Sequence, residues 1–329
     1  MDTDVVEVNR ALRHVDQLNH LLQVYTRRIA YLSIAAQNVR ILRLTLPSLC
    51  RKPFPLIEYI DLEAAPDALH ASRNYSLAQS PNLRTLWLAA IPFSFSNVIY
   101  ENLTSLTIGE ITIVPGDLRD AAKACPNLTV LHLDAVGIKL DGGEFIRFPR
   151  LESLRLANIA GPDGYLDWLD APALSLIAIS FCTLASHGVS TFDPSILRPF
   201  PTVRLLRCES LDAIPAPPFD GNVFQYVPGA TTLALRDCCM GEGSLAAHLA
   251  AAVPAPLPAL QTLVVGELES GGLEAVLRIV RHRIQHEVPL KEVQLGKDIR
   301  EAMDAELLRT LEELVMVTTA PDVDDLDDS

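Results

Sequence analysis

Two histidines in the C-terminal third of the chain have a spacing that could bind a metal ion. His282 and His286 are four residues apart in a segment predicted to be helical, so both rings would lie on one side of that helix. Arg281 and Arg283 flank the first histidine, and no third ligand occurs nearby in the sequence. We therefore expect a solvated helix face at this position and no metal site.

No motif for catalysis or phosphate binding occurs in the sequence. The chain contains no G-x-x-x-x-G-K-[ST] loop, no G-x-G-x-x-G, no G-x-S-x-G and no H-E-x-x-H. Cys238 and Cys239 are adjacent rather than spaced as a ligand pair, and Glu312 and Glu313 point in different directions on a helix. We expect no catalytic residue and no cofactor, so the chain is predicted not to be an enzyme.

Charge and cysteine usage limit the kinds of partner. The formal net charge of −14 disfavours a nucleic acid partner, because phosphate binding requires an excess of lysine and arginine. No apolar signal segment follows Met1, and no apolar run reaches the ~20 residues of a membrane span. The six cysteines have no regular spacing, which favours a reducing compartment. We expect a cytoplasmic or nuclear protein that binds neither membranes nor nucleic acids.

A short phrase, Pro-x-Leu-x-x-Leu-x-Leu, recurs along the chain. Close copies begin at Pro81, Pro126, Pro149 and Pro258, and looser copies bring the total to about twelve windows, spaced by roughly 20–30 residues. Copies that agree in residue type, order and spacing are typical of a leucine-rich repeat solenoid. The looser windows begin at Val39, Ile57, Leu103, Leu174, Val203, Ala230, Leu290 and Leu311.

Within one window the apolar residues alternate with other residues, as in a half-buried strand. In the second close copy, Leu131 and Leu133 are expected in the core, whereas Val130, His132 and Asp134 face outward. The proline has no N–H and disfavours helix in the residue before it, so it should start the strand. The predicted fold class is α/β, a solenoid with parallel strands on its concave face and helices and turns on its convex face.

Another apolar residue follows three positions after the last core residue of each window. Many leucine-rich repeats carry asparagine there, so this chain is expected to use packing in place of a hydrogen bond to the backbone. Cys182 and Cys238 occupy this position and are predicted to be small core residues rather than reactive thiols. Helices are expected on the convex side at residues 115–124, 243–253, 271–287 and 298–311.

The two ends of the chain differ from the repeats. Apolar residues at spacings of three and four predict an amphipathic helix, so residues 1–28 are expected to form an N-terminal capping helix. Residues 29–318 would form a solenoid of about 12 irregular repeats. The strand phrase also fits Ile29–Ile34, so a further strand could precede Val39. The acidic residues 319–329 are expected to be a disordered tail.

Candidate binding residues are the outward side chains of the predicted strands. Large and charged side chains concentrate between Arg43 and Arg207, and the later repeats carry smaller ones. Trp and Arg often contribute most of the binding energy at interfaces, so Trp87 is the expected anchor. The alternative is that these side chains are exposed without a partner. The candidates for a protein-binding concave face are Arg43, Tyr59, Asp61, Trp87, His132, Asp134, Arg155 and Arg207.

Residues 29–318 resemble the irregular leucine-rich repeat region of fungal F-box proteins, in the ribonuclease-inhibitor-like superfamily. The resemblance rests on the Pro-Asn-Leu copies at Pro81 and Pro126, the Phe-Pro variants at Phe148 and Phe200, and the stretch 25–34. In this family the F-box binds a Skp1-like adaptor of a cullin ubiquitin ligase, while the repeats select the substrate. The F-box module itself is not present in this sequence, so no adaptor-binding residue is assigned.

The resemblance implies a non-enzymatic protein that acts as the substrate-recognition part of an F-box type ubiquitin ligase. A Skp1-like adaptor would be a partner if an F-box lies upstream. The alternative is a free leucine-rich repeat scaffold or regulator with no link to ubiquitin ligation. A third class, a GTPase-activating leucine-rich repeat protein, would need a catalytic side chain on a loop near the strand ends, and no such loop is evident.

Overall fold

The structure is a computed structural model, and it divides into two units. Unit 1 comprises Met1–Leu151 and unit 2 comprises Glu152–Ser329. Among the described residues, no helix combines the length and the apolar character that a membrane crossing requires. The structure describes residues 15–36, 45–47, 49–50, 53–64, 76–77, 80–96, 98–138, 145–159, 163–182, 199–211, 222–238, 244–267, 272–302 and 304–320.

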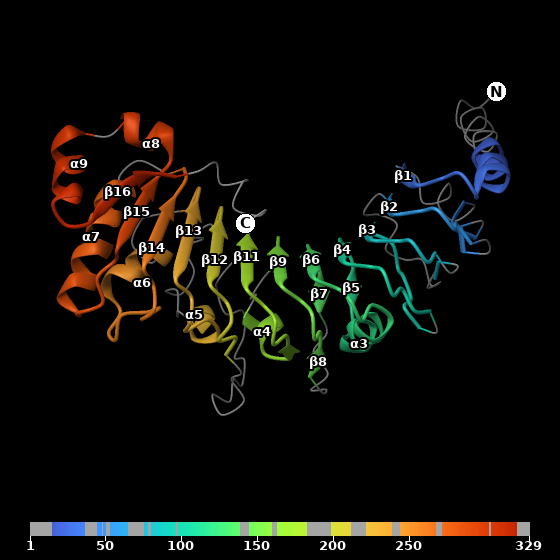
Figure 1. Cartoon of the computed structure of the whole chain (residues 1–329), viewed down its shortest axis with the longest axis horizontal. Coiled ribbons are helices and arrows are strands. Elements are labelled where there is room, and N and C mark those ends of the chain that lie inside the picture. Colours follow the sequence, from blue (N-terminus) through green and yellow to red (C-terminus); the bar gives the residue numbers. More distant parts are fainter. Residues whose placement is uncertain are drawn as a thin grey trace, which may run out of the picture. The chain divides into compact units, whose positions relative to one another are not determined.

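The architecture is mixed α/β, with twelve parallel strands among the described residues, five in unit 1 and seven in unit 2. The strands of unit 1 follow one another in the order of the chain (Figure 1). They pair with no offset, so that Leu86 lies opposite both Ile60 and Leu106. These strands are β1 (Tyr31–Ala36), β2 (Tyr59–Ala64), β3 (Thr85–Ala89), β4 (Ser105–Gly109) and β6 (Val130–Asp134).

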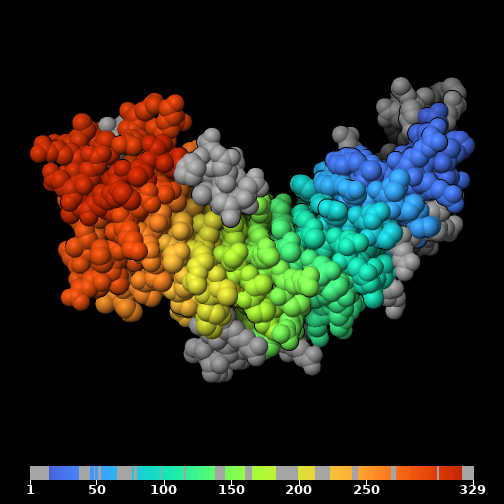
Figure 2. All heavy atoms as spheres, in the orientation of Figure 1, coloured from blue at the N-terminus to red at the C-terminus, as the bar shows by residue number. Residues whose placement is uncertain are grey.

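The strands of unit 2 also follow chain order, and Figure 2 shows the same succession of colours at the surface within this unit. They are β9 (Ser153–Ala157), β11 (Leu176–Ser180), β12 (Leu205–Glu209), β13 (Thr232–Arg236), β14 (Thr262–Val265), β15 (Glu292–Leu295) and β16 (Met316–Thr319). One unbroken row of opposed residues crosses them: Leu154, Ile177, Leu206, Leu233, Leu263, Val293 and Val317.

The repeated phrase forms the buried face of these strands, as predicted. In β6, Leu131 and Leu133 are 1% and 2% exposed, whereas Val130, His132 and Asp134 are half-buried. The same alternation recurs in β1 to β4, because successive side chains of a strand point to opposite faces. The aliphatic core of unit 1 is therefore built from the same two positions of each repeat.

The first and last strands differ from the prediction. The further strand expected at Ile29–Ile34 is confirmed by β1. Because β1 pairs directly with β2, no strand from the window at Val39 lies between them. Residues 37–44 lie outside the described residues. The window at Leu311 is wrong, because Leu311 is buried within a helix and the last strand begins at Met316. Apolar residues three apart fit both the strand phrase and one face of a helix.

Helices lie within three of the predicted segments, and the fourth segment holds two. Residues 298–311 were expected to form one helix, but Asp304 accepts a hydrogen bond from the backbone N–H of Glu306 at 2.8 Å and caps a new helix there. Residues 15–25 are also helical, with Val15 and Leu22 buried. The helices are α3 (Pro115–Ala124), α4 (Asp163–Leu166), α5 (Asn222–Tyr226), α6 (Leu245–Ala251), α7 (Gly272–Gln285), α8 (Lys297–Ala302) and α9 (Ala305–Glu312).

Short strands accompany the main ones. Of these, β5 and β7 pair in parallel within unit 1. In unit 2, α6 and α7 pack against each other, and their buried residues belong to the core of that unit. The short strands are β5 (Thr112–Ile113), β7 (Gly137–Ile138), β8 (Ile146–Arg147) and β10 (Leu169–Asp170).

Asparagine side chains join successive repeats at the start of the strands. The amides of Asn82, Asn102 and Asn127 each donate a hydrogen bond of 2.6 Å to a backbone carbonyl in the preceding repeat. A buried or turn carbonyl without a partner is costly, so these bonds stabilise the turn that precedes each strand. The asparagine of the Pro-Asn-Leu phrase therefore has a structural role.

A residue with left-handed backbone geometry follows seven of the described strands. Its N–H continues the ladder: the N–H of Ala90 donates to the carbonyl of Gly109, and the N–H of Ser210 donates to that of Arg236, both at 2.9 Å. Left-handed geometry is unfavourable for residues other than glycine, so the bond and the turn after the strand offset a local steric cost. These residues have φ between 45° and 55° and are Ala90, Glu110, Ala135, Asn158, Phe181, Ser210 and Asp237.

Candidate functional site

The candidate site is the outer face of the strands, defined here as the face formed by the first, third and fifth residues of each strand. The second and fourth residues fill the core, so only the outer face is available to a partner. Unit 1 and unit 2 present different outer faces, and each is described separately. Of the candidate residues, Arg43 lies outside the described residues.

The outer face of unit 1 carries three aromatic side chains. The rings of Tyr31 and Tyr59 stack with centroids 4.4 Å apart and planes 5° apart, because the two residues are opposite each other in β1 and β2. Trp87 is 43% exposed and lies opposite Asp61. The structure thus brings three of the candidates, Tyr59, Asp61 and Trp87, together on two neighbouring strands.

Two carboxylates lie among these rings. Asp61 accepts a hydrogen bond of 2.9 Å from the hydroxyl of Ser33, and the exposed Glu63 follows two residues later on the same face. Neither carboxylate forms an ion pair with any residue that the structure describes. Partial burial, the Asp61 charge and the Tyr31 phenol group together raise the pKa of the Tyr59 phenol above its ordinary value of 10.0.

The remaining candidates of unit 1 lie farther along the sheet. His132 is in β6, separated from Trp87 by Thr107 of β4, and Asp134 ends the same strand. Both side chains are half-buried and have partners of their own. They extend the outer face of unit 1 toward its last strand but do not contact the stacked tyrosines.

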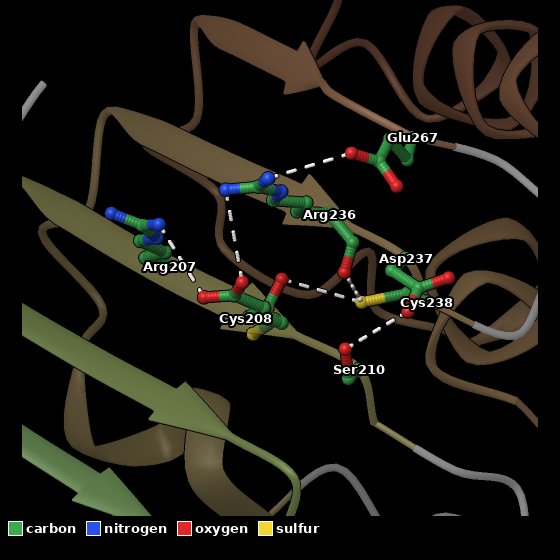
Figure 3. A network of polar contacts seen from close by, with 8 residues as sticks. Arg207, Cys208, Ser210, Arg236, Asp237, Cys238 and Glu267 are labelled. Atoms are coloured by element: carbon green, nitrogen blue, oxygen red, sulfur yellow. Dashed lines mark hydrogen bonds and ion pairs between the residues drawn. The ribbon is translucent and has the colours of Figure 1, made fainter. Parts of the chain in front are cut away.

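The outer face of unit 2 carries a chain of ion pairs, and Figure 3 shows Arg207, Arg236 and Glu267 of this chain. The carboxylate of Glu209 lies 3.4 Å from the guanidinium of Arg207 and 3.8 Å from that of Arg236. Arg236 reaches Glu267 at 3.4 Å on its other side. The chain follows from the register, because Glu209 of β12 is opposite Arg236 of β13. The charges on this part of unit 2 are therefore compensated within the protein.

Arg207 was expected to be exposed, and that expectation is wrong. Its side chain is 10% exposed and bends along its own strand to Glu209. The neighbours in register are Ala178 and Ala234, which are small and leave room for the guanidinium to lie close to the sheet. Arg155 of β9 is half-buried and has contacts of its own.

Two cysteines occupy the position after the left-handed residue, and both are buried, as predicted. The thiol of Cys238 is 3.3 Å from the carbonyl oxygens of Cys208 and Arg236, and that of Cys182 is 3.5 Å from the carbonyl of Leu156. The expectation of packing alone is therefore incomplete, because the S–H can donate to the backbone where many repeats use asparagine. Burial raises the pKa of Cys238 to about 11, so its thiol stays protonated at neutral pH.

His282 is not on a solvated helix face, contrary to the sequence prediction. Its ring is 8% exposed and its Nε2 atom is 3.0 Å from the carbonyl oxygen of Ala252, just after α6. Such a carbonyl at a helix end needs a donor, which the imidazole N–H supplies in this tautomer. The ring of the exposed His286 lies 4.4 Å from that of His282. In the described parts of the chain, no three His, Cys, Asp or Glu side chains form a group that could hold a metal.

Several residues of the two outer faces were not among the candidates. Tyr31 was missed because the predicted first window began at Val39, although the phrase at Ile29–Ile34 already indicated its strand. Arg236 and Glu267 were missed because the later repeats were expected to carry smaller outward side chains. No protein-family model matches this sequence. The search of curated proteins likewise gives no match.

Proposed function

We propose that this chain is a leucine-rich repeat solenoid that binds a protein partner through the outer face of unit 1. The observation that carries the proposal is the group formed by the stacked Tyr31 and Tyr59 with Trp87 and Asp61 beside them. Rigid aromatic rings contribute much of the energy of protein interfaces at a small cost in conformational entropy. The zero-offset register of the strands supports the solenoid assignment.

The proposed role is binding rather than catalysis. On the resemblance to the repeat region of fungal F-box proteins, the partner is the substrate of an F-box type ubiquitin ligase, and the protein works in the cytoplasm or nucleus. In that case a Skp1-like adaptor would accompany the complex. A free scaffold or regulator without ubiquitin-ligase components is the other outcome, and it would use the same face.

Affinity purification with quantitative mass spectrometry tests the proposal. The tagged wild-type chain is compared with Trp87→Ala and with Phe181→Ala, whose ring in unit 2 is 57% exposed and serves as a matched control. We expect one or more proteins to be captured by wild type and Phe181→Ala and depleted at least about tenfold with Trp87→Ala. Equal capture by all three proteins would overturn the proposed binding face.

The same experiment separates the two roles. Recovery of a Skp1-like adaptor together with the Trp87-dependent partner supports the ligase role. A Trp87-dependent partner recovered repeatedly without an adaptor or cullin component supports the free scaffold. Chemical cross-linking of the purified complex should then join the partner to residues of β1, β2 or β3.

A further inference from the structure

The described strands of unit 1 carry acidic and aromatic side chains on their outer face but no lysine or arginine. Of the described strand residues in β1 to β4 and β6, none at an outer-face position is lysine or arginine. Asp61 lies between Tyr59 on its own strand and Trp87 on the next, at spacings of about 6.6 Å along the strand and about 4.8 Å across it. A positively charged group would meet a carboxylate and an aromatic face at the same time.

In unit 2, carboxylates near the outer face form ion pairs with arginines of the same unit. There Glu209 lies between the guanidinium groups of Arg207 and Arg236, and Glu267 pairs with Arg236. In unit 1, Asp61 and Glu63 have no such partner among the described residues. Among the described residues of unit 1, no lysine or arginine pairs with Asp61 or Glu63 as Arg207 and Arg236 pair with Glu209 in unit 2, and a binding partner can supply such a cation.

We infer that the outer face of unit 1 binds an arginine-bearing segment of a partner protein, with the guanidinium held by Asp61 and Glu63 against Tyr59 and Trp87. This inference rests on the proposed function and specifies its partner class. Arginine suits the site better than lysine, because a planar guanidinium both stacks on aromatic rings and pairs with a carboxylate through two parallel hydrogen bonds. An acidic segment would be repelled by the two carboxylates and by the chain's net charge of −14.

Four labelled peptides test the inference on the full chain: hexa-arginine, hexa-lysine, hexa-glutamine and hexa-glutamate. Binding is measured by fluorescence anisotropy at about 150 mM salt, where nonspecific surface attraction is screened beyond about 8 Å. We expect hexa-arginine to bind at least about tenfold more tightly than hexa-glutamine, and hexa-lysine to fall between them. Hexa-glutamate should not bind.

Variants of equal charge then locate the site. The double variant Asp61→Asn/Glu63→Gln should weaken hexa-arginine binding at least about fivefold, because two charge-assisted contacts are lost. The control Asp298→Asn/Glu301→Gln removes the same charge from exposed positions on α8 and should change binding by less than about twofold. Trp87→Ala should weaken binding about as much as the double variant does. Circular dichroism confirms that each variant is folded.

Three results would overturn the inference. These are equal binding of hexa-arginine and hexa-glutamine, equal losses in the double variant and its control, and unchanged binding by Trp87→Ala. The outcome is separable from that of the proposed function. If Trp87→Ala releases the cellular partner but Asp61→Asn/Glu63→Gln does not, the protein-binding face stands and the arginine inference falls. If hexa-arginine binds as expected but no Trp87-dependent partner is captured, the proposed function falls and the arginine site stands.

Discussion

Tyr31 and Tyr59 stack face to face across the first two strands, with their ring planes 5° apart. The pair is a direct product of the register, since residues opposite each other in parallel strands have side chains within contact distance. Because Tyr31 is 62% exposed while Tyr59 is half-buried, the first ring covers the second. Asp61, two residues beyond Tyr59, adds a negative charge beside the covered phenol.

The Tyr59 phenol should therefore titrate above pH 10. Burial disfavours the phenolate most, and the Asp61 carboxylate disfavours it further, so Asp61→Asn and Tyr31→Ala should each lower the pKa toward 10.0. The titration can be followed by NMR with tyrosine labelled at the ring carbon that bears the hydroxyl, with the resonance assigned by Tyr59→Phe. A Tyr59 pKa that is identical in all three proteins would contradict this account. Since the folded pKa exceeds the unfolded one, the associated stability is full below pH 10 and is lost as the pH rises through the folded pKa.

A substitution in the core should lower the free energy of unfolding much more than a substitution on the outer face. Leu131→Ala removes a side chain that is 1% exposed and should lower the free energy of unfolding by ~2–5 kcal/mol, through lost burial and the cavity left behind. Trp87→Ala should cost less than about 1 kcal/mol, because its ring is 43% exposed. Chemical denaturation followed by circular dichroism measures both values. Similar losses of stability in the two variants would mean that the two faces of the strands have been exchanged.

The ion-pair chain of unit 2 should contribute to stability through its central carboxylate. Glu209→Gln removes the charge shared by Arg207 and Arg236 and should cost about 1–2 kcal/mol, a range already reduced for the solvent that reaches Arg236. The matched control is Glu313→Gln, which breaks the Arg309–Glu313 pair, whose side chains are 82% and 64% exposed. The control should cost less than about 0.5 kcal/mol. If Glu209→Gln and Glu313→Gln lower the stability equally in thermal denaturation, the burial of Arg207 does not strengthen its ion pair with Glu209.

Glycine substitutions should change stability in opposite directions at a left-handed position and at a position within a strand. Ala135 has φ 49° and an exposed side chain, so Ala135→Gly removes steric strain and should raise the free energy of unfolding by up to about 1 kcal/mol. Ala35 is equally exposed but lies within β1, so Ala35→Gly should lower it by about 0.5–1 kcal/mol. Melting temperatures of the two variants test this pair. A decrease in both would show that the turn after β6 does not require left-handed geometry.

Most of the fold could be predicted from the sequence, because the core imposes one spacing on every repeat. Ile60, Leu86 and Leu106 each have a neighbour on both sides, so their positions leave a regular pattern. The end strands lack one neighbour, and their pattern is weaker. At Leu311 the same apolar spacing served a helix, and the helix start at Asp304 depended on one capping side chain.

The outer faces were predictable only in part. Outer-face side chains do not pack in the core, so their residue types do not recur from one repeat to the next. The exposure of Trp87 was predicted from its outward position in the strand phrase, whereas the burial of Arg207 depends on the small alanines in register with it on both neighbouring strands. The packing of His282 against Ala252 depends on a contact 30 residues away, which helix periodicity does not reveal.

The zero-offset register has a consequence for how this protein can change. Within each unit the outer-face side chains stand at regular positions, every second residue along a strand and directly opposite one another on neighbouring strands. Because the outer-face residues do not pack in the leucine core, one outer-face residue can be substituted without moving the backbone of its neighbours. Specificity can therefore diverge by single substitutions while the scaffold remains the same.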